Sequence, residues 1–261
     1  MRTEIPVQIP FTNYGDSVKR ALDAIGTADI LPRNRRIILK PNLTNDSPPP
    51  VTTPVDLVEA VYLYCKARTS APICIGEGCG SGKTADTFAG NGYTRLARRY
   101  GIELIDFNSA PTTRMASPEA LQLHEFFLPT VAIDAFIVSL PVLKDHSFTT
   151  TTIAMKNMFG LAPERIYGGS WNKSRLHSPS THHSVVDICG YKKPELCVVD
   201  AVTALTGMHL AGTPKRLNTI IAGIDAVAVD ALGSRLLGHN PDTIAYLQLA
   251  NGKLGNMNPT I

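Results

Sequence analysis

Short apolar runs, bounded by glycine, proline or polar residues, recur along most of the chain. Their length and their content of Ile, Val, Leu and Phe are typical of buried β-strands. Such strands are predicted at residues 5–10, 36–40, 72–76, 102–107, 125–128, 135–140, 196–199 and 217–222.

Segments with apolar residues spaced three and four apart follow most of these runs, and this spacing predicts helices. Repeated units of strand, loop and helix favour an α/β fold, with a largely parallel or mixed sheet and helices on both faces. No internal repeat or linker stands out, so residues 1–261 are expected to form a single domain. The first predicted helix begins near Asp16 or Ser17. Further helices are predicted at residues 56–66, 85–100 with a break at 90–92, 184–190, 225–237 and 242–251.

In sheets of this kind, ligands bind beyond the carboxyl ends of the strands. The loops that follow Leu39, Ile75 and Leu140 are therefore expected to share one rim. The long segment at residues 162–183 is rich in Gly, Ser, His and Pro, and it contains Trp171, the only tryptophan. Loops of this length are more often functional than idle, so we expect it to serve the site and to add little to the core.

The segment at residues 141–161 joins a predicted strand to a helical pattern and is the strongest candidate for the site. It contains Lys144 and His146, then a run of threonines, then Lys156. A helix that begins within the threonines would place Thr149, Thr152 and Lys156 on one face. Its free N–H groups and its dipole would favour a bound anion.

Composition and charge exclude several classes of protein. Hydrophobic residues at 44% and charged residues at 18% are typical of a soluble globular protein, and a net charge of +3 is too small to indicate nucleic-acid binding. No apolar segment is long enough to span a bilayer, and the N-terminal MRTEIPVQIPF has no hydrophobic signal core, so we expect a cytoplasmic protein. The five cysteines include no Cys-x-x-Cys pair, so no disulfide framework, structural zinc site or iron–sulfur cluster is expected.

The glycine-rich segment at residues 76–84 resembles a phosphate-binding P-loop between a strand and a helix. The P-loop register misses by one residue, because its first glycine should stand where the sequence has Glu77. A loop that brings Glu77 and bare backbone toward a ligand is the favoured interpretation, and a P-loop-like nucleotide binder is an alternative.

Histidines in polar loops suggest a second alternative, a divalent metal. The candidate ligands are His177, His182 and Asp200, although their spacing matches no zinc signature. Two further carboxylates flank the start of the helix at 225–237. We expect Asp225 to be its N-cap, whereas Asp230 lies a turn further in on an apolar helix and needs a buried partner, which would let it support the site from behind.

Several motifs, in this order, resemble the domain of unknown function 362 family over nearly the whole chain. The resemblance implies a single α/β domain whose chemistry is largely uncharacterised, with His177 or His182 as the counterpart of a later family histidine. Some members are joined to a ferredoxin-type iron–sulfur module, whose cysteines this chain lacks. The motifs are Leu39-Lys40-Pro41-Asn42-Leu43, Thr52-Thr53-Pro54-Val55, Gly76-Glu77-Gly78, Pro141-Val142-Leu143-Lys144 with His146, Met155-Lys156-Asn157-Met158-Phe159-Gly160, Val198-Val199-Asp200-Ala201 and Asp225-Ala226-Val227-Ala228-Val229-Asp230.

The expected function is that of an enzyme acting on a small anionic organic substrate, a carboxylate or a phosphate, by proton transfer or isomerisation. Glu77, His146 and Lys144 are the predicted catalytic residues. The alternatives are a redox or electron-transfer accessory protein without its own cluster and the nucleotide binder, and the partners considered are a redox protein or a second copy of the chain. The predicted substrate-binding residues are Lys40, Asn42, Thr149, Thr152, Lys156 and Asn157.

Overall fold

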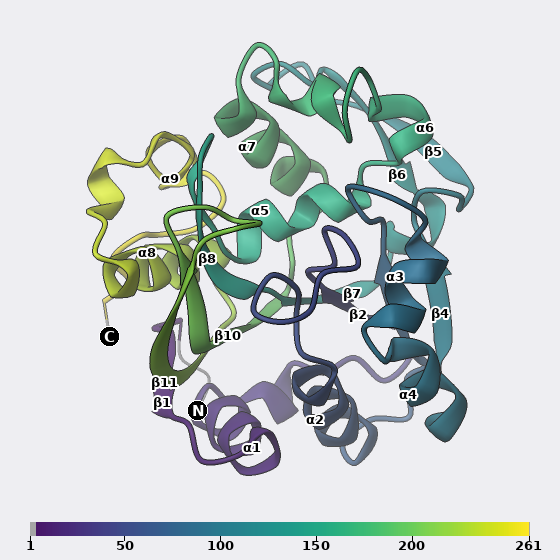
Figure 1. Ribbon diagram of the computed structural model, residues 1–261, viewed down its shortest axis with the longest axis vertical. Coiled ribbons are helices and arrows are strands. Elements are labelled where there is room, and N and C mark those ends of the chain that lie inside the picture. The colour runs from purple at the N-terminus through teal and green to yellow at the C-terminus, as the bar shows by residue number, and fades with distance from the viewer. Residues whose placement is uncertain (1–3, 261) are drawn as a thin grey trace.

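A mixed β-sheet organises the protein, and the computed structural model describes residues 4–260. Within these residues the sheet has nine strands, in the order β1-β11-β10-β7-β2-β3-β4, with β8 and β9 attached beside β10 (Figure 1). The strands are β1 (Val7–Pro10), β2 (Ile37–Pro41), β3 (Ile73–Glu77), β4 (Glu103–Asp106), β7 (Phe136–Leu140), β8 (Val142–His146), β9 (Thr150–Thr152), β10 (Leu196–Thr206) and β11 (Thr213–Gly223).

The central strands β10, β7, β2, β3 and β4 run parallel to one another, whereas β1, β11 and β9 pair antiparallel with their neighbours. The predicted α/β fold with a mixed sheet is therefore confirmed. Because β2, β3 and β7 are parallel neighbours, the loops after Leu39, Ile75 and Leu140 do share one edge of the sheet. The strand predicted at residues 125–128 is β6 (Glu125–Pro129), which pairs with β5 (Thr112–Ala116) in a separate two-stranded sheet.

Helices cover both faces of the sheet. Because successive side chains of a strand point to opposite faces, a single strand can pack against helices on both sides. Ile37 and Leu39 pack into a core with α1, α2 and α4, whereas Ile38 packs into a second core with α7 and α9. Helix α8 covers the sheet near β10 and β11. The helices are α1 (Tyr14–Ala24), α2 (Val55–Lys66), α3 (Thr84–Gly90), α4 (Tyr93–Tyr100), α5 (Ala154–Asn157), α6 (Glu164–Tyr167), α7 (Thr181–Tyr191), α8 (Ala226–Leu237) and α9 (Ala245–Ala250).

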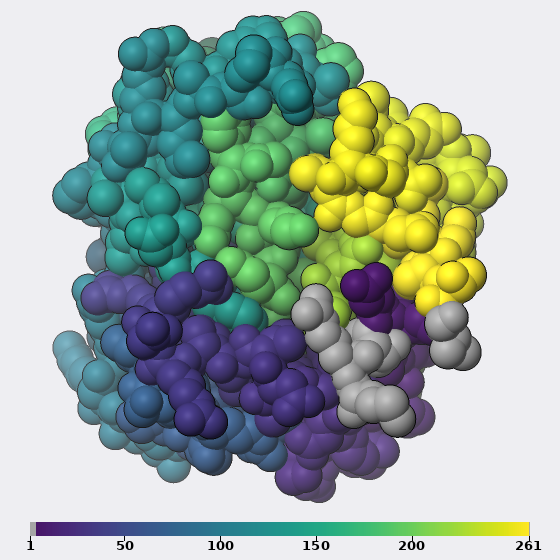
Figure 2. Space-filling model, turned by 180° about the vertical axis from the view of Figure 1, so that it is seen from behind, coloured from purple at the N-terminus to yellow at the C-terminus, as the bar shows by residue number. Residues whose placement is uncertain are grey.

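Most predicted helices are confirmed, including the break between α3 and α4, but some of their starts differ. Helix α1 is capped by Asn13, whose side-chain oxygen accepts from Asp16 N, and not by Asp16 or Ser17. Asp225 caps α8 as predicted, accepting from the amides of Val227 and Ala228. The C-terminal segment returns to this cap, because Asn256 N also donates to Asp225. From behind, the yellow C-terminal segment lies beside the purple N-terminal segment (Figure 2).

The prediction that a helix begins within the threonine run was wrong. Thr150–Thr152 form strand β9, which folds back on β8, and α5 begins only at Ala154. After Pro141 the chain keeps its direction, and β8 pairs parallel with β10 beyond the point where β7 does. Strand β10 is correspondingly longer than predicted, since it runs to Thr206 rather than to Val199.

The segment at residues 162–183 contains more structure than predicted. It includes α6, a 3₁₀ helix (Ser174–His177) and the first turn of α7. Leu176 and Tyr167 are buried in the core that α7 shares with β6, so the expectation of a small core contribution was wrong.

Candidate functional site

A cavity of about 250 Å³ lies at the carboxyl edge of the parallel strands. The ends of β2 and β3 form one side of it, β8 and β9 form another, and the 3₁₀ helix that follows α5 (Met158–Leu161) forms a third. Residues of the 162–183 segment and of the turn between β10 and β11 complete the wall. Pockets for drug-sized ligands measure roughly 300–1,000 Å³, so this cavity suits a smaller molecule.

Strand geometry explains why β8 supplies two cavity residues. Because side chains alternate along a strand, Lys144 and His146 face the cavity, whereas Leu143 packs into the core on the other side. Asp145 also points away, and its carboxylate accepts from Gly207 N and lies 2.7 Å from His239 Nε2. This pair anchors the β10–β11 turn beside the cavity.

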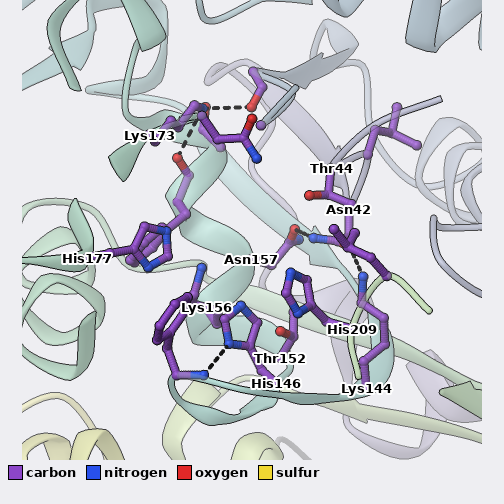
Figure 3. Close-up of a pocket in the computed structure, with 18 of the residues that line it drawn as sticks. Asn42, Thr44, Lys144, His146, Thr152, Lys156, Asn157, Lys173, His177 and His209 are labelled. Atoms are coloured by element: carbon purple, nitrogen blue, oxygen red, sulfur yellow. Dashed lines mark hydrogen bonds between the residues drawn. The ribbon is translucent and has the colours of Figure 1, made fainter. Parts of the chain in front are cut away.

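Four lysines, Lys40, Lys144, Lys156 and Lys173, are buried around the cavity, each at most 8% exposed. Three of them are seen entering the same space from different sides (Figure 3). Among the described residues that line the cavity, Glu77 is the only acidic one. The wall therefore has a large excess of positive charge whenever the lysines are protonated, and a buried charge without a partner is costly.

Lys40 and Glu77 form a buried ion pair between the ends of β2 and β3. Lys40 Nζ donates to both carboxylate oxygens, at 2.9 and 3.0 Å. The same oxygens accept from Gly78 N and Leu43 N, so all of the carboxylate's acceptor positions are in use. A Cβ at position 160 would collide with this pair, which explains why a glycine follows Phe159. The arrangement suits Glu77 for holding the strand ends rather than for moving a proton.

Lys144 is held by neutral groups. Its Nζ donates to Asn42 Oδ1 at 2.8 Å and to Val51 O at 2.7 Å. Burial lowers the pKa of Lys144 to about 7, and Glu77 opposes this shift. The Asn42 side chain in turn donates to Asn157 Oδ1, so that Asn157 links Asn42 to Lys40. A lysine with a pKa near 7 can give up or take a proton at neutral pH.

Lys173 is also held by neutral groups, and within residues 4–260 these are backbone carbonyls. Its Nζ donates to the carbonyl oxygens of Gly78 and Phe159, at 2.7 and 3.3 Å. Burial lowers the pKa of Lys173 to about 8.

Lys156 has the fewest polar contacts of the four lysines. Within residues 4–260, its Nζ makes no hydrogen bond or ion pair, and it lies 3.4 Å from the centre of the Phe159 ring. Burial lowers the pKa of Lys156 well below its usual value, and Lys144, Lys173 and Lys40 add to this effect. Figure 3 shows Lys156 between His177 and His146. An anion here would supply the missing counter-charge.

Three histidines line the same space. His146 and His209 stack with ring centres 4.1 Å apart, and His177 packs against Phe159 at 5.7 Å. Burial, with nearby lysines, lowers the pKa of His146 well below its usual value and those of His177 and His209 to about 4. His146 Nδ1 accepts from Phe148 N, so the neutral ring carries its proton on Nε2. All three imidazoles are therefore neutral at pH 7.

Unpaired polar atoms also gather here. In the part of the chain that the structure describes, three buried side-chain polar atoms have no hydrogen-bond partner. Two of them, Thr152 Oγ1 and His209 Nδ1, belong to residues that line the cavity. Because buried polar groups are nearly always paired, both atoms are available to hydrogen-bond a molecule in the cavity.

Comparisons with known proteins agree with the resemblance of the sequence motifs. The family model described as a domain of unknown function (DUF362) matches residues 37–235. This chain belongs to the DUF362 family. It is also 26% identical over 252 residues to a protein of Synechocystis sp. named as thylakoid-associated, with 94% of this chain and 75% of that protein covered. None of the helices in residues 4–260 of the DUF362 chain is long and apolar enough to cross a bilayer.

Most of the predicted substrate-binding residues meet at the cavity of this DUF362 protein. Asn42, Thr152, Lys156 and Asn157 line it, and Lys40 lies directly behind Glu77. Thr149 does not line it, because it lies in the turn before β9, where its hydroxyl donates to Thr151 O. The helix N-terminus predicted to bind the anion is also occupied by protein.

Asp230 of α8 occupies that N-terminus. Its carboxylate accepts from Ala154 N at 2.7 Å, from Met155 N at 3.2 Å and from Tyr246 Oη at 3.0 Å. The prediction that Asp230 supports the site from behind thus fits the structure, although the first two amides of α5 are paired with Asp230 rather than available to an anion. The positive charge comes from the lysines instead.

The residues of the metal alternative do not come together. His177 lines the cavity, whereas His182 Nδ1 accepts from Tyr246 N on another side of α7. Asp200 lies in a separate cavity, where its carboxylate accepts from Tyr14 Oη at 2.7 Å. Among the described residues there is no group of three or more His, Cys, Asp or Glu that could hold a metal ion.

The glycine-rich loop of the DUF362 chain is folded on itself rather than open to a phosphate. The amides of Gly80 and Ser81 donate to Thr44 O, and Thr84 Oγ1 contacts Cys79 Sγ. Lys83 is exposed and does not line the cavity. This geometry gives the nucleotide alternative little support.

Phe148, Trp171, Lys173 and His209 are among the cavity residues that were not predicted individually as site residues. Trp171 and Lys173 come from the segment that the sequence marked as functional. His209 had no local signal, because it lies in an ordinary turn between two long strands and reaches the cavity only through the pairing of β10 with β8.

Proposed function

We propose that the chain is an enzyme that binds a small organic carboxylate or phosphate in the cavity and transfers a proton on it. The observation that carries the proposal is Lys156, a buried lysine whose Nζ makes no hydrogen bond or ion pair within residues 4–260 and lies over the Phe159 ring. Lys144 and Lys173 add positive charge that only neutral groups balance. A bound anion would neutralise this charge and raise the pKa of all three lysines.

The neutral groups beside the anion suit proton transfer. His209 Nδ1 is buried and free to accept a proton, and His146 has an Nε2 proton to donate. Lys144, whose pKa is about 7 in the free protein, exchanges its own proton with solvent at neutral pH. We assign the removal of a substrate proton to His209 and the stabilisation of the developing negative charge to Lys144, Lys156 and His146.

Titration of inorganic phosphate and of succinate by calorimetry tests the proposal. Replacing Lys156 with Met keeps the side-chain volume and removes the charge, so affinity for both anions should fall by roughly 10- to 100-fold. The matched control is Lys66→Met, which removes an exposed lysine at the end of α2 and should change neither affinity. Equal affinities in the wild type and Lys156→Met would contradict the proposal.

A further inference from the structure

Aromatic side chains form one wall of the cavity, next to Lys156. Phe148 and Trp171 lie nearly parallel, with ring centres 6.1 Å apart and planes 18° apart. His177 contacts both rings, at 5.2 Å from Phe148 and 4.8 Å from Trp171. His177 also packs on Phe159, whose face carries the Lys156 ammonium group. A continuous path of rings therefore runs from the buried cation to the mouth of the cavity.

The outer end of this path is exposed. Phe148 is 50% exposed and Trp171 is 46% exposed, although both line the cavity. Leu210, on the β10–β11 turn, lines the same mouth and is 40% exposed, and Met208 precedes it by two residues. Of the five large hydrophobic side chains exposed in the described part of the chain, three line this cavity, and a fourth, Met208, lies in the same turn as Leu210. Exposed apolar groups gathered at one place mark a binding surface.

We infer that the ligand is an anion with a planar, apolar group, whose charged end lies against Lys156 and whose ring stacks on Trp171 and Phe148. This inference rests on the proposed anion site, and it adds the second half of the ligand. Flat rings prefer offset stacking on aromatic side chains and gain further from burial of apolar area. Aliphatic anions of the same charge would leave the aromatic wall exposed to solvent.

Two phosphate monoesters distinguish the contribution of the anionic group from that of the ring. Phenyl phosphate and methyl phosphate carry the same charge and differ in the ring, so the wild type should bind phenyl phosphate about tenfold more tightly. Trp171 is the only tryptophan, so its fluorescence should change with phenyl phosphate and report on the ring directly. The carboxylate pair benzoate and acetate is measured in parallel and should show the same preference.

Three variants assign the preference to its residues. Trp171→Ala should abolish the preference for phenyl phosphate and leave the affinity for methyl phosphate within about twofold, because the lysines are untouched. Trp171→Phe should retain it, since a ring remains. The matched control Leu63→Ala removes an exposed apolar side chain from α2 and should change neither affinity.

The outcomes distinguish the inference from the proposal on which it rests. Binding that depends on Lys156 but shows no preference for the ring esters, or a preference that survives Trp171→Ala, would overturn the aromatic half alone. Esters and carboxylates that do not bind, or that bind equally well to Lys156→Met, would overturn both.

Discussion

At the scale of single residues, the site is defined by lysines that lack counter-ions. When no anion is bound, burial favours their neutral forms, and mutual repulsion adds to this for Lys156 and Lys173. Glu77 is engaged with Lys40 and compensates the others only through space. An anion that binds here must therefore bring protons with it or draw them from solvent.

This coupling predicts that anion affinity falls as pH rises. In the free protein Lys144 and Lys173, with pKa values of about 7 and 8, lose their protons between pH 6 and 9. The bound anion favours the charged lysines, so their pKa values rise on binding and the complex holds more protons than the free protein. Affinity for succinate, which stays fully ionised above pH 7, should fall by up to tenfold per pH unit for each lysine that is reprotonated.

Calorimetry of succinate binding in buffers of different ionisation enthalpy measures the proton uptake directly. Lys144→Met should weaken binding at pH 6 and also reduce the pH dependence between 7 and 9 by about one proton. A wild-type affinity that is constant from pH 7 to 9 would be incompatible with lysines of lowered pKa at the site.

At the scale of elements, the junction of β9 with α5 decides where Thr152 and Lys156 lie. The carboxylate of Asp230 replaces the missing hydrogen-bond acceptors at the start of this short helix. Tyr246 Oη joins the carboxylate to Thr151 of β9, at 2.9 Å from its hydroxyl. Helix α8 thus fixes two consecutive elements of the cavity wall from the side opposite the ligand.

Asp230→Asn should therefore weaken both folding and anion binding. An amide presents an N–H₂ group to donors that need an acceptor, so we expect a loss of about 1–3 kcal/mol of unfolding free energy. Phosphate affinity should fall several-fold, because Lys156 is carried by the displaced helix.

The control is Asp225→Asn, which disturbs the cap at the start of the same helix α8. Asp225 accepts from Val227, Ala228 and Asn256, and it does not line the cavity. This variant should lose stability in urea unfolding while keeping the phosphate affinity of the wild type. Equal changes in affinity for the two variants would show that Asp230 acts only through global stability.

The same junction shows where prediction from the sequence succeeded and where it failed. The strands at residues 36–40, 72–76 and 135–140 were predicted correctly, because continuous apolar runs are buried on both faces of a parallel sheet. The threonine run was misassigned, because its spacing matches a helix whereas its β-branched residues favour a strand, and pairing with β8 decided the outcome. The sequence around the threonines does not indicate that they pair with β8.

At the scale of the whole molecule, the cavity is made by segments far apart in the sequence that meet at one edge of the sheet. The rule that ligands bind at the carboxyl ends of parallel strands was enough to predict this edge and most of the residues on it. The rule could not provide His209, since the β10–β11 turn reaches the cavity only because β10 bends to follow β8. The position of this turn depends on which strands pair in the folded protein, and a local sequence pattern does not indicate that pairing.

Hydrogen exchange on the whole chain tests whether these segments act as one site. A ligand at 100 times its Kd stabilises the bound state by about 2.7 kcal/mol, which slows exchange through local opening by about 100-fold. Saturating phenyl phosphate should slow exchange in residues 142–160, 171–177 and 205–212 together, because each segment contributes to the cavity wall. Helices α2 and α4, which cover the other face of the sheet, provide the internal control and should not change. Protection confined to residues 78–84 would instead support the P-loop-like alternative, and protection of residues 142–160 without 205–212 would exclude the β10–β11 turn, and His209 with it, from the ligand site.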